Sequence, residues 1–408
     1  MNRGIVRPLW LEEIYGGREK EIANTDGFVM PGCVKKINKC GMDPTDCKIK
    51  VAFFRDGPFL PVMTGVAASI LGMMEALCSC GVKVVLIKAV REFDDTDLYE
   101  RMPFDTYFLN EADFYGDDNL LIRKILKEEK INIAQFDSAE AINIQSHLIP
   151  KEIKKIFEVM DVESDLMIQL GANSEKVEYI RSEEVKTSDN ADLFLFRSKE
   201  NVVKFQENTL LDISHKTHLY RGGIDVKKCP YRNDRFLCGE NVLFLGHLNY
   251  EPNILALDDI SKYIAPYIRK NILVVGDIQE NLICKYGHNK NIIFKGRVDN
   301  LASVFANAFV GIAPLTVGSG TRLKILDYMA AGLPVICSNL AIEGLEEEIK
   351  DFVLTEDDFS RYPELIENIK DHFNVEDIDS ALEYILHNRS WDAVIGDVIS
   401  AYSNILQL

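Results

Sequence analysis

Residues 313–345 read APLTVGSGTRLKILDYMAAGLPVICSNLAIEGL, and this stretch decides the fold of the chain. It starts at the end of an apolar run, residues 309–315, that is typical of a buried parallel strand. A loop of small residues follows at 317–321, and a helical pattern then runs up to Gly332 and Pro334. The stretch belongs to an alternation of strands and helices that runs over residues 241–337, and this alternation predicts a doubly wound α/β sheet.

The small-residue loop is suited to binding an anion. Glycines lack a Cβ atom and let a ligand approach the backbone, and a helix N-terminus offers unpaired N–H groups and the positive end of a dipole. Arg322 and Lys324 add full positive charges in the first helical turn, where the dipole disfavours cations unless an anion binds. We therefore expect a phosphate to be bound here by the group Gly318, Ser319, Gly320, Thr321, Arg322 and Lys324.

The same stretch resembles the donor-site motif of retaining glycosyltransferases with the GT-B fold, of the kind grouped in glycosyltransferase family 4. In one branch of that family the pattern reads roughly G-S-G-T-R-x-K-x-x-E-A-M-A-x-G-x-P-V-V, followed by G-x-E-G-L. The match is long and ordered, and its members are Gly318, Ser319, Gly320, Thr321, Arg322, Lys324, Met329, Ala330, Gly332, Pro334, Val335, Glu343, Gly344 and Leu345. The alternative is an ordinary βα turn in which Lys324 pairs with Asp327 one turn later.

The resemblance implies a function and roles for these residues. It implies two Rossmann-like domains facing a cleft, and transfer of a sugar with retention from a nucleotide-diphosphate sugar, without a metal ion or another cofactor. Arg322 and Lys324 would stabilise the leaving diphosphate and are the expected catalytic residues. Asp327 stands where relatives hold the ribose hydroxyls, and Glu343 and Gly344 are expected substrate-binding residues. The acceptor would be a glycan, a lipid-linked oligosaccharide or a protein, in polysaccharide or glycoconjugate biosynthesis.

Two glycines outside this stretch also resemble positions of the family. Residues 241–253, NVLFLGHLNYEPN, resemble the first strand and loop of the donor domain, so Gly246 and His247 are expected at the donor phosphates. Many relatives carry Arg at the position of His247, and a solvated loop histidine is the alternative reading. Gly65 sits where relatives place a glycine-rich turn that lets the donor and the acceptor approach the first helix.

The remaining periodicity predicts two Rossmann-like domains. At 408 residues the chain exceeds a comfortable single core. We expect a first domain over 48–222, an irregular extension over 1–47 and a donor domain over 223–390. The expected strands are 49–54, 83–87, 131–136, 157–160 and 193–196, and then 241–245, 272–275, 292–294, 310–315 and 334–337. The amphipathic segment 391–408 would cross back to the first domain by resemblance, the alternative being packing on the second.

The amino-acid composition argues against some classes of binding partner. With 46 basic and 64 acidic residues the net charge is -18, which argues against nucleic-acid binding. No apolar run approaches the 18 or so residues of a membrane span, and the N-terminus is not typical of a signal peptide, so we expect a cytoplasmic protein in which peripheral membrane contact stays open. Nine cysteines without a C-x-x-C pair favour reduced thiols, and we expect no metal site.

Two other functions fit the same fold. A sugar-nucleotide epimerase would also bind a nucleotide between two Rossmann-like domains, although the GSGTRLK pattern is not typical of that class. A non-catalytic protein that binds sugar nucleotides or glycans is the other alternative, because His247, Pro252 and Thr64 replace residues that relatives use. Asp161, Glu163 and Ser164 resemble a D-x-[DE]-S stretch of the same branch, the alternative being a polar loop between a strand and a helix.

Overall fold

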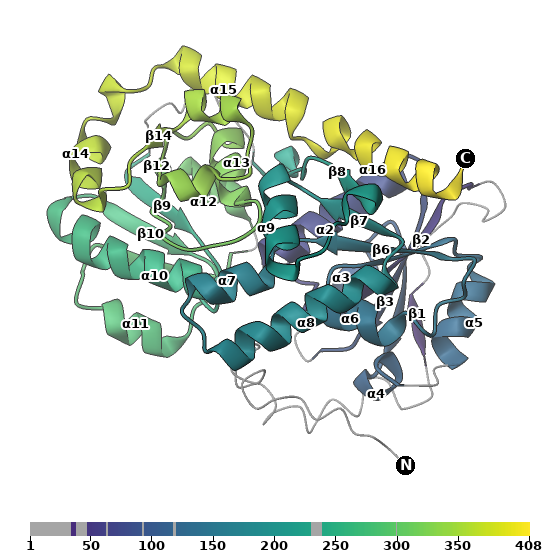
Figure 1. Cartoon of the computed structure of the whole chain (residues 1–408). Coiled ribbons are helices and arrows are strands. Elements are labelled where there is room, and N and C mark those ends of the chain that lie inside the picture. Colours follow the sequence, from purple (N-terminus) through teal and green to yellow (C-terminus); the bar gives the residue numbers. More distant parts are fainter. Residues whose placement is uncertain are drawn as a thin grey trace.

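The computed structural model of the protein describes residues 34–37, 47–62, 64–91, 94–116, 120–229, 239–298 and 300–408. Within them the chain forms two sheets (Figure 1). The strand order is β1-β4-β3-β2-β5-β6-β7-β8 in the first sheet and β11-β10-β9-β12-β13-β14 in the second. Every described pair of strands is parallel except β1 with β4. The predicted fold class, α/β with two parallel-sheet domains, is confirmed.

The strands of both sheets are short. Those of the first sheet are β1 (Lys35–Ile37), β2 (Lys50–Arg55), β3 (Lys83–Ala89), β4 (Asp105–Leu109), β5 (Ile133–Phe136), β6 (Lys154–Val159), β7 (Leu193–Phe196) and β8 (Thr217–Leu219). Those of the second are β9 (Asn241–Leu245), β10 (Asn271–Val275), β11 (Ile292–Gly296), β12 (Ala308–Ala313), β13 (Val335–Cys337) and β14 (Leu354–Thr355).

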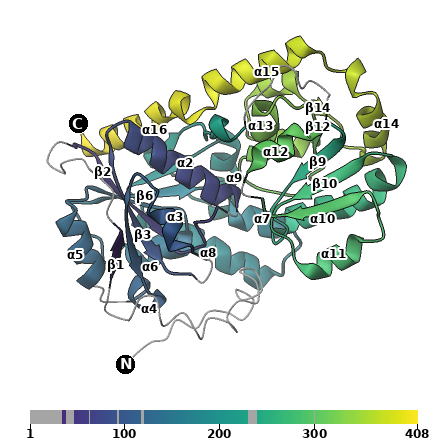
Figure 2. The same ribbon diagram turned by 180° about the vertical axis from the view of Figure 1, so that it is seen from behind.

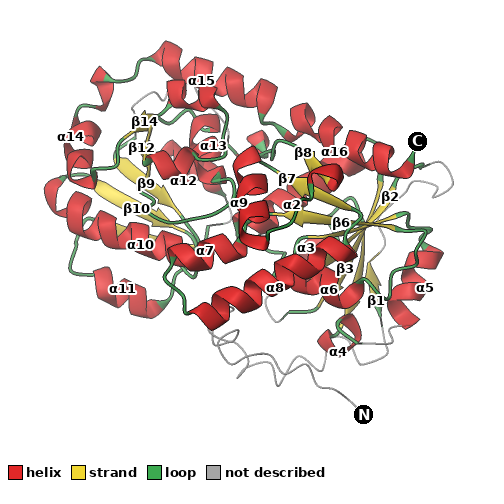
Figure 3. Ribbon diagram, in the orientation of Figure 1, coloured by secondary structure: helices red, strands yellow, loops and turns green. Residues whose placement is uncertain are grey.

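Helices connect the strands and surround both sheets (Figure 3). Those of the first half are α2 (Gly65–Ser79), α3 (Thr96–Tyr99), α4 (Glu111–Phe114), α5 (Leu120–Glu128), α6 (Ala139–Gln145), α7 (Glu163–Gln169), α8 (Ser174–Asn190) and α9 (Lys199–Thr209). Those of the second are α10 (Glu251–Asp259), continued by a π-helical turn (Ile260–Ile264), α11 (Glu280–Tyr286), α12 (Leu301–Ala306), α13 (Leu323–Ala330), α14 (Tyr362–Glu367), α15 (Val375–Asn388) and α16 (Trp391–Leu406). Short 3₁₀ turns lie at Ser214–Lys216, Val226–Lys228, Ala265–Tyr267, Asn339–Ile342, Glu347–Phe352, Phe359–Arg361 and Ile369–Asp371.

Both faces of the first sheet are buried, which is why its central strands are continuous apolar runs. Alternate side chains of β2 enter different cores: Val51 and Phe53 belong to one cluster, and Ala52 and Phe54 to another. A parallel sheet covered on both faces has no solvent side, so its strands do not alternate between apolar and polar residues. The predicted strands of this half were recognisable for that reason.

Several elements were not predicted. β4 (DTYFL) and β8 (THL) contain polar residues and are not continuous apolar runs. β14 has two residues and α11 has seven, which are too few to show a period. β1 lies inside the segment 1–47 that was expected to be irregular, and it pairs antiparallel with β4 at the edge of the first sheet. The expectation for that segment is therefore wrong at residues 35–37, while most of its remaining residues lie outside the described part of the chain.

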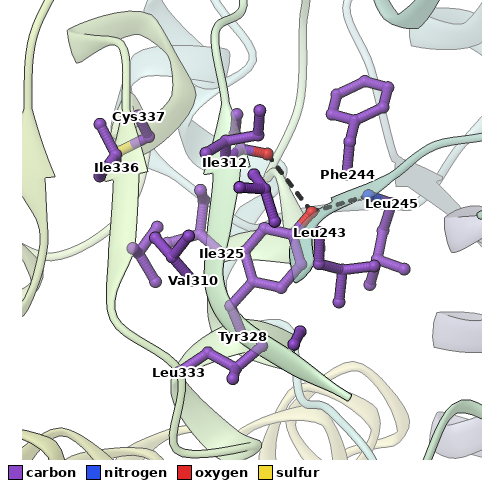
Figure 4. Close-up of a cluster of buried hydrophobic side chains, with 14 of the residues drawn as sticks. Leu243, Phe244, Leu245, Val310, Ile312, Ile325, Tyr328, Leu333, Ile336 and Cys337 are labelled. Carbon is purple, nitrogen blue, oxygen red and sulfur yellow. Dashed lines mark hydrogen bonds between the residues drawn. The ribbon is translucent and has the colours of Figure 1, made fainter. Parts of the chain in front are cut away.

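A buried tyrosine fixes α13 against the second sheet (Figure 4). The ring of Tyr328 lies on the backbone of Gly311, where a Cβ atom would come within 2.5 Å of the ring. The hydroxyl of Tyr328 accepts a hydrogen bond from the backbone N–H of Leu245 at 2.7 Å. α13 is thereby held across β12 and β9, and this sets the position of its N-terminus.

The last helix, α16, packs on the first domain. Its apolar side chains share a core with α2 and β2, and the two helices lie side by side in Figures 1 and 2. Trp391 occupies the space that Gly72 of α2 and Gly223 leave free. The hydroxyl of Tyr402 donates a hydrogen bond to the buried side chain of Gln135 in β5.

Candidate active site

The candidate site lies at the carboxyl edge of the second sheet, where the direction of the chain connections reverses. β9 pairs with β10 on one side and with β12 on the other. The loops that follow β9 and β12 therefore leave the sheet next to each other, which is where doubly wound sheets bind ligands. The loop after β9 contains Gly246 and His247, and the loop after β12 contains residues 314–322. The fold thus brings the two predicted donor segments together.

The glycine loop adopts backbone conformations that require its glycines. Gly318 has a φ of 154° and Gly320 a φ of 71°, and both values are strained for residues with a Cβ atom. A Cβ atom on Gly320 would also collide with the carboxylate of Asp161, which belongs to the first domain. The loop is therefore shaped by close contact with protein on that side.

Arg322 precedes the helix instead of lying within its first turn, which corrects the sequence-based expectation. It is the N-cap residue of α13, and its guanidinium folds back onto the loop. Nη1 donates to the carbonyl oxygens of Gly320 at 2.7 Å and Glu343 at 3.1 Å, and Nη2 donates to that of Gly318 at 2.9 Å. Much of the hydrogen-bonding capacity of Arg322 thus stabilises the loop itself.

Two polar atoms of this loop are buried without a hydrogen-bond partner among the described residues. They are Nε of Arg322 and Oγ1 of Thr321. Arg322 is 8% exposed, and its burial lowers the pKa of the guanidinium. Buried polar atoms normally have partners, so these two atoms are available to an anion at the start of α13.

Lys324 is the second cation of the site, and its ammonium lies in a partly apolar environment. Nζ donates to Oδ1 of Asn253 at 2.7 Å and lies 4.7 Å from the ring centre of Phe244. Burial, together with the charge of Arg322, lowers the pKa of Lys324 to about 7. This geometry does not favour the alternative in which Lys324 pairs with Asp327, because Nζ of Lys324 donates its hydrogen bond to Asn253.

Asn253 was not among the residues predicted from sequence. It is 7% exposed, and its side-chain amide donates to the carbonyl oxygen of His247 at 3.0 Å while its Oδ1 accepts from Lys324. A Cβ atom on Gly246 would come within 2.9 Å of Cγ of Asn253, so the glycine makes room for this side chain. The one signal in the sequence is an asparagine near the start of a helix, next to Pro252.

Some of the other predicted residues contact Arg322 or the first domain, and some lie elsewhere in the two domains. Glu343 is close: its carboxylate lies 3.6 Å from Nη2 of Arg322 and 2.9 Å from Nζ of Lys204 in the first domain. Gly344, with a φ of 79°, leaves room for Ser198 of the first domain.

Asp327 lies on α13, partly buried, one turn after Lys324. Gly65 begins α2 in the first domain, and space is open around it.

Groups of the first domain contact the glycine loop directly. The backbone N–H of Val162 donates to Oγ of Ser319 at 2.9 Å, and the side chain of Gln169 pairs with the backbone of Gly318. Burial raises the pKa of Asp161 to about 6, although the charges of Arg322 and Arg197 oppose that shift. Of the D-x-[DE]-S stretch, Asp161 and Val162 therefore lie against the loop.

Comparisons with known proteins found a family that matches part of the chain and solved structures with the same fold. Residues 239–371 match the family model described as glycosyl transferases group 1. Sucrose-phosphate synthase from Thermosynechococcus elongatus aligns over 88% of this chain and 100% of its own, with a TM-score of 0.71 and 15% identity. HepE from Anabaena in complex with UDP and glucose aligns over 88% of this chain and 98% of its own, with a TM-score of 0.66 and 12% identity. WaaG, a glycosyltransferase involved in lipopolysaccharide biosynthesis, aligns over 86% and 98%, with a TM-score of 0.62 and 14% identity.

At these identities the structural matches show the fold, which is the GT-B fold of two facing Rossmann-like domains. Residues 239–371 are similar to the glycosyltransferase group 1 family, and the predicted class of enzyme, a glycosyltransferase, is confirmed. A comparison with curated protein sequences gave no match. None of the helices in the described ranges combines the length and the apolar character needed to cross a bilayer.

Proposed function

We propose that this protein transfers a sugar from a nucleotide-diphosphate sugar to an acceptor hydroxyl, with retention at the anomeric carbon. One observation carries the proposal: Arg322 and Lys324 place two partly or fully buried positive charges at the edge where the chain connections reverse. Nε of Arg322 is buried there without a partner among the described residues. The proposed retention rests on the resemblance of the motif. The structure of HepE with UDP-glucose supports the class of donor.

Arg322 and Lys324 would stabilise the diphosphate as it leaves the donor sugar. The bond between the anomeric carbon and the diphosphate oxygen breaks, and the acceptor oxygen forms a bond to the same carbon. The acceptor releases its hydroxyl proton, and the diphosphate gains negative charge as it leaves. The ammonium of Lys324 and Nε of Arg322 would stabilise that charge, and the backbone N–H groups at 319–321 would add hydrogen bonds. A diphosphate next to Lys324 would raise the pKa of its ammonium from about 7, so the lysine would be protonated when the donor is bound.

Other residues would bind the rest of the two substrates. Asp327 would hold the ribose of the donor, and Gly246 and His247 would contact the phosphates from the loop after β9. The acceptor, a glycan, a lipid-linked oligosaccharide or a protein, would enter from the first domain, where space is open around Gly65 at the start of α2. We further propose a role in polysaccharide or glycoconjugate biosynthesis in the cytoplasm.

The test is a screen of UDP-, GDP-, dTDP- and ADP-sugars for binding, for donor hydrolysis and for transfer to glycan acceptors. Free nucleoside diphosphate that forms faster with an acceptor, together with a new glycosidic product, is the expected result. An isomerised donor without acceptor would identify an epimerase instead. Tight binding of a sugar nucleotide without turnover over the acceptor panel would identify a non-catalytic binding protein.

A further inference from the structure

The side chain of Gln169, in the first domain, forms hydrogen bonds with the backbone of the glycine loop in the second domain. Its Oε1 accepts from the N–H of Gly318 at 2.9 Å, and its Nε2 donates to the carbonyl oxygen of the same residue at 3.2 Å. One primary amide therefore satisfies both backbone groups of one glycine, 149 positions along the chain. Loop peptides usually find such partners within their own segment or in water, so this contact ties the loop to α7.

Gln169 belongs to a longer contact that we name the α7 clasp, residues 160–169. Within it the N–H of Val162 donates to Ser319, and the carboxylate of Asp161 lies against Gly320. On the other side of the junction, Tyr250 of the second domain packs on the apolar cluster of α7 and α8. In Figures 1 and 2, α7 lies at the junction of the two domains. Three successive residues of the glycine loop, 318–320, thus contact one segment of the first domain.

A chain of polar contacts holds Gln169 in place and returns to the loop. Nε2 of Gln169 also donates to Asp165 at 2.7 Å, and Asp165 lies 3.5 Å from Nζ of Lys204. Lys204 donates to the carboxylate of Glu343 at 2.9 Å, and that carboxylate lies 3.6 Å from Arg322. Arg322 in turn donates to the carbonyl oxygen of Gly318. The carbonyl of Gly318 is therefore shared by the amide of Gln169 and the guanidinium of Arg322.

We propose that Gln169 is a positioning residue, which fixes the peptide of Gly318 and so sets where Arg322 can present its free Nε. Contact between the domains would then assemble the diphosphate site, because α7 would hold the loop in its binding conformation. This inference rests on the proposed function of the same site. It adds that donor binding and domain closure are coupled through one side chain.

The experiment compares Gln169→Met with the wild-type protein; this variant keeps the length of the side chain but loses both hydrogen bonds to Gly318 and the one to Asp165. Gln206→Met is the matched control, because within the described part of the chain the side chain of Gln206 bonds only to Asp212 and Ser214 of the first domain. Hydrogen exchange is followed in peptides that cover residues 316–323. Binding of a nucleoside diphosphate and of the parent nucleoside, and kcat and KM for the donor, are measured on the same samples.

We expect faster exchange at 316–323 in Gln169→Met and a Kd for the diphosphate that rises about threefold to tenfold, the effect of one or two hydrogen bonds. Binding of the nucleoside should stay unchanged, kcat should fall as well as KM rise, and the control should match the wild type. Unchanged exchange would overturn the contact. Faster exchange with an unchanged Kd, or with an equal loss for nucleoside and diphosphate, would overturn the positioning role. A wild-type protein that binds no nucleotide would contradict the proposed function, and the exchange result would still test the contact.

Discussion

Lys324 on α13 donates a hydrogen bond from Nζ to Oδ1 of Asn253 on α10, and the two atoms are 2.7 Å apart. The partner in this contact is a neutral amide, and Arg322 adds a second positive charge that lowers the pKa of the lysine. A buried ammonium is costly unless a negative charge compensates it. The pair is therefore arranged for an anion that arrives from outside the protein.

The first prediction concerns the two cations. Lys324→Ala and Arg322→Ala should each weaken binding of a nucleoside diphosphate more than binding of the nucleoside. They should also raise the barrier to transfer by roughly 2–4 kcal/mol, the cost of removing one such group. Calorimetry and steady-state kinetics measure both effects. Lys350→Ala is the control, because Lys350 pairs with Glu347 in a 3₁₀ turn and lies outside the candidate site. Equal losses for nucleoside and diphosphate would refute the phosphate role.

The second prediction concerns pH. The pKa of Lys324 is about 7 in the free protein, below its usual value of 10.5. A bound diphosphate raises it, so above pH 7 the lysine must take up a proton when the donor binds. Affinity should therefore fall by up to about tenfold per pH unit above pH 7 and level off below it. Calorimetry at pH 8 in buffers of different ionisation enthalpy should detect the proton that is taken up.

A sugar nucleotide is the ligand for that experiment, because its esterified phosphates do not titrate near pH 7. Lys324→Met provides the control, since it should bind weakly at every pH and take up no proton through this position. Proton uptake that persists at pH 8 in Lys324→Met would assign the titration to another group.

The third prediction concerns Asn253. Asn253→Leu keeps a similar volume but removes the acceptor that supports the ammonium of Lys324. The pKa of the lysine should then fall further, and the pH above which donor affinity declines should move below 7. The pH dependence of donor binding measures this shift. An unchanged midpoint would show that Asn253 does not support the charge.

The fourth prediction concerns the last helix. Gly72→Ala places a methyl group against the indole of Trp391, so it should lower the free energy of unfolding by about 1–3 kcal/mol, as overpacking does. Gly396→Ala on α16 is the matched comparison, because nothing lies within 4 Å of a Cβ atom there. It should stabilise by roughly 0.5–1 kcal/mol through helix propensity. Chemical denaturation measures both changes, and two changes of the same sign would contradict the packing of α16 on α2.

The sequence predicted those parts of the fold that local patterns encode. The apolar run at 241–245 is β9 with the same bounds, and the run at 309–315 overlaps β12, because buried parallel strands are apolar along their whole length. The class of enzyme and the two-domain architecture followed from the resemblance of one stretch, 313–345, to a family motif, and the two parallel sheets also from the alternation of strands and helices in both halves of the chain. The assigned roles of the residues in that stretch remain predictions.

Tertiary structure alone decided which side chains complete the site. Asn253 meets Lys324 across 71 positions, and Gln169 meets Gly318 across 149, and no period within either segment records its partner. The same holds for β1, which takes its place at the sheet edge from pairing with β4. Helical and strand periods reflect which face of a segment is buried, whereas a partner depends on how separate segments pack in space. For that reason the sequence located the cationic loop, and the folded chain supplied the residues that hold it.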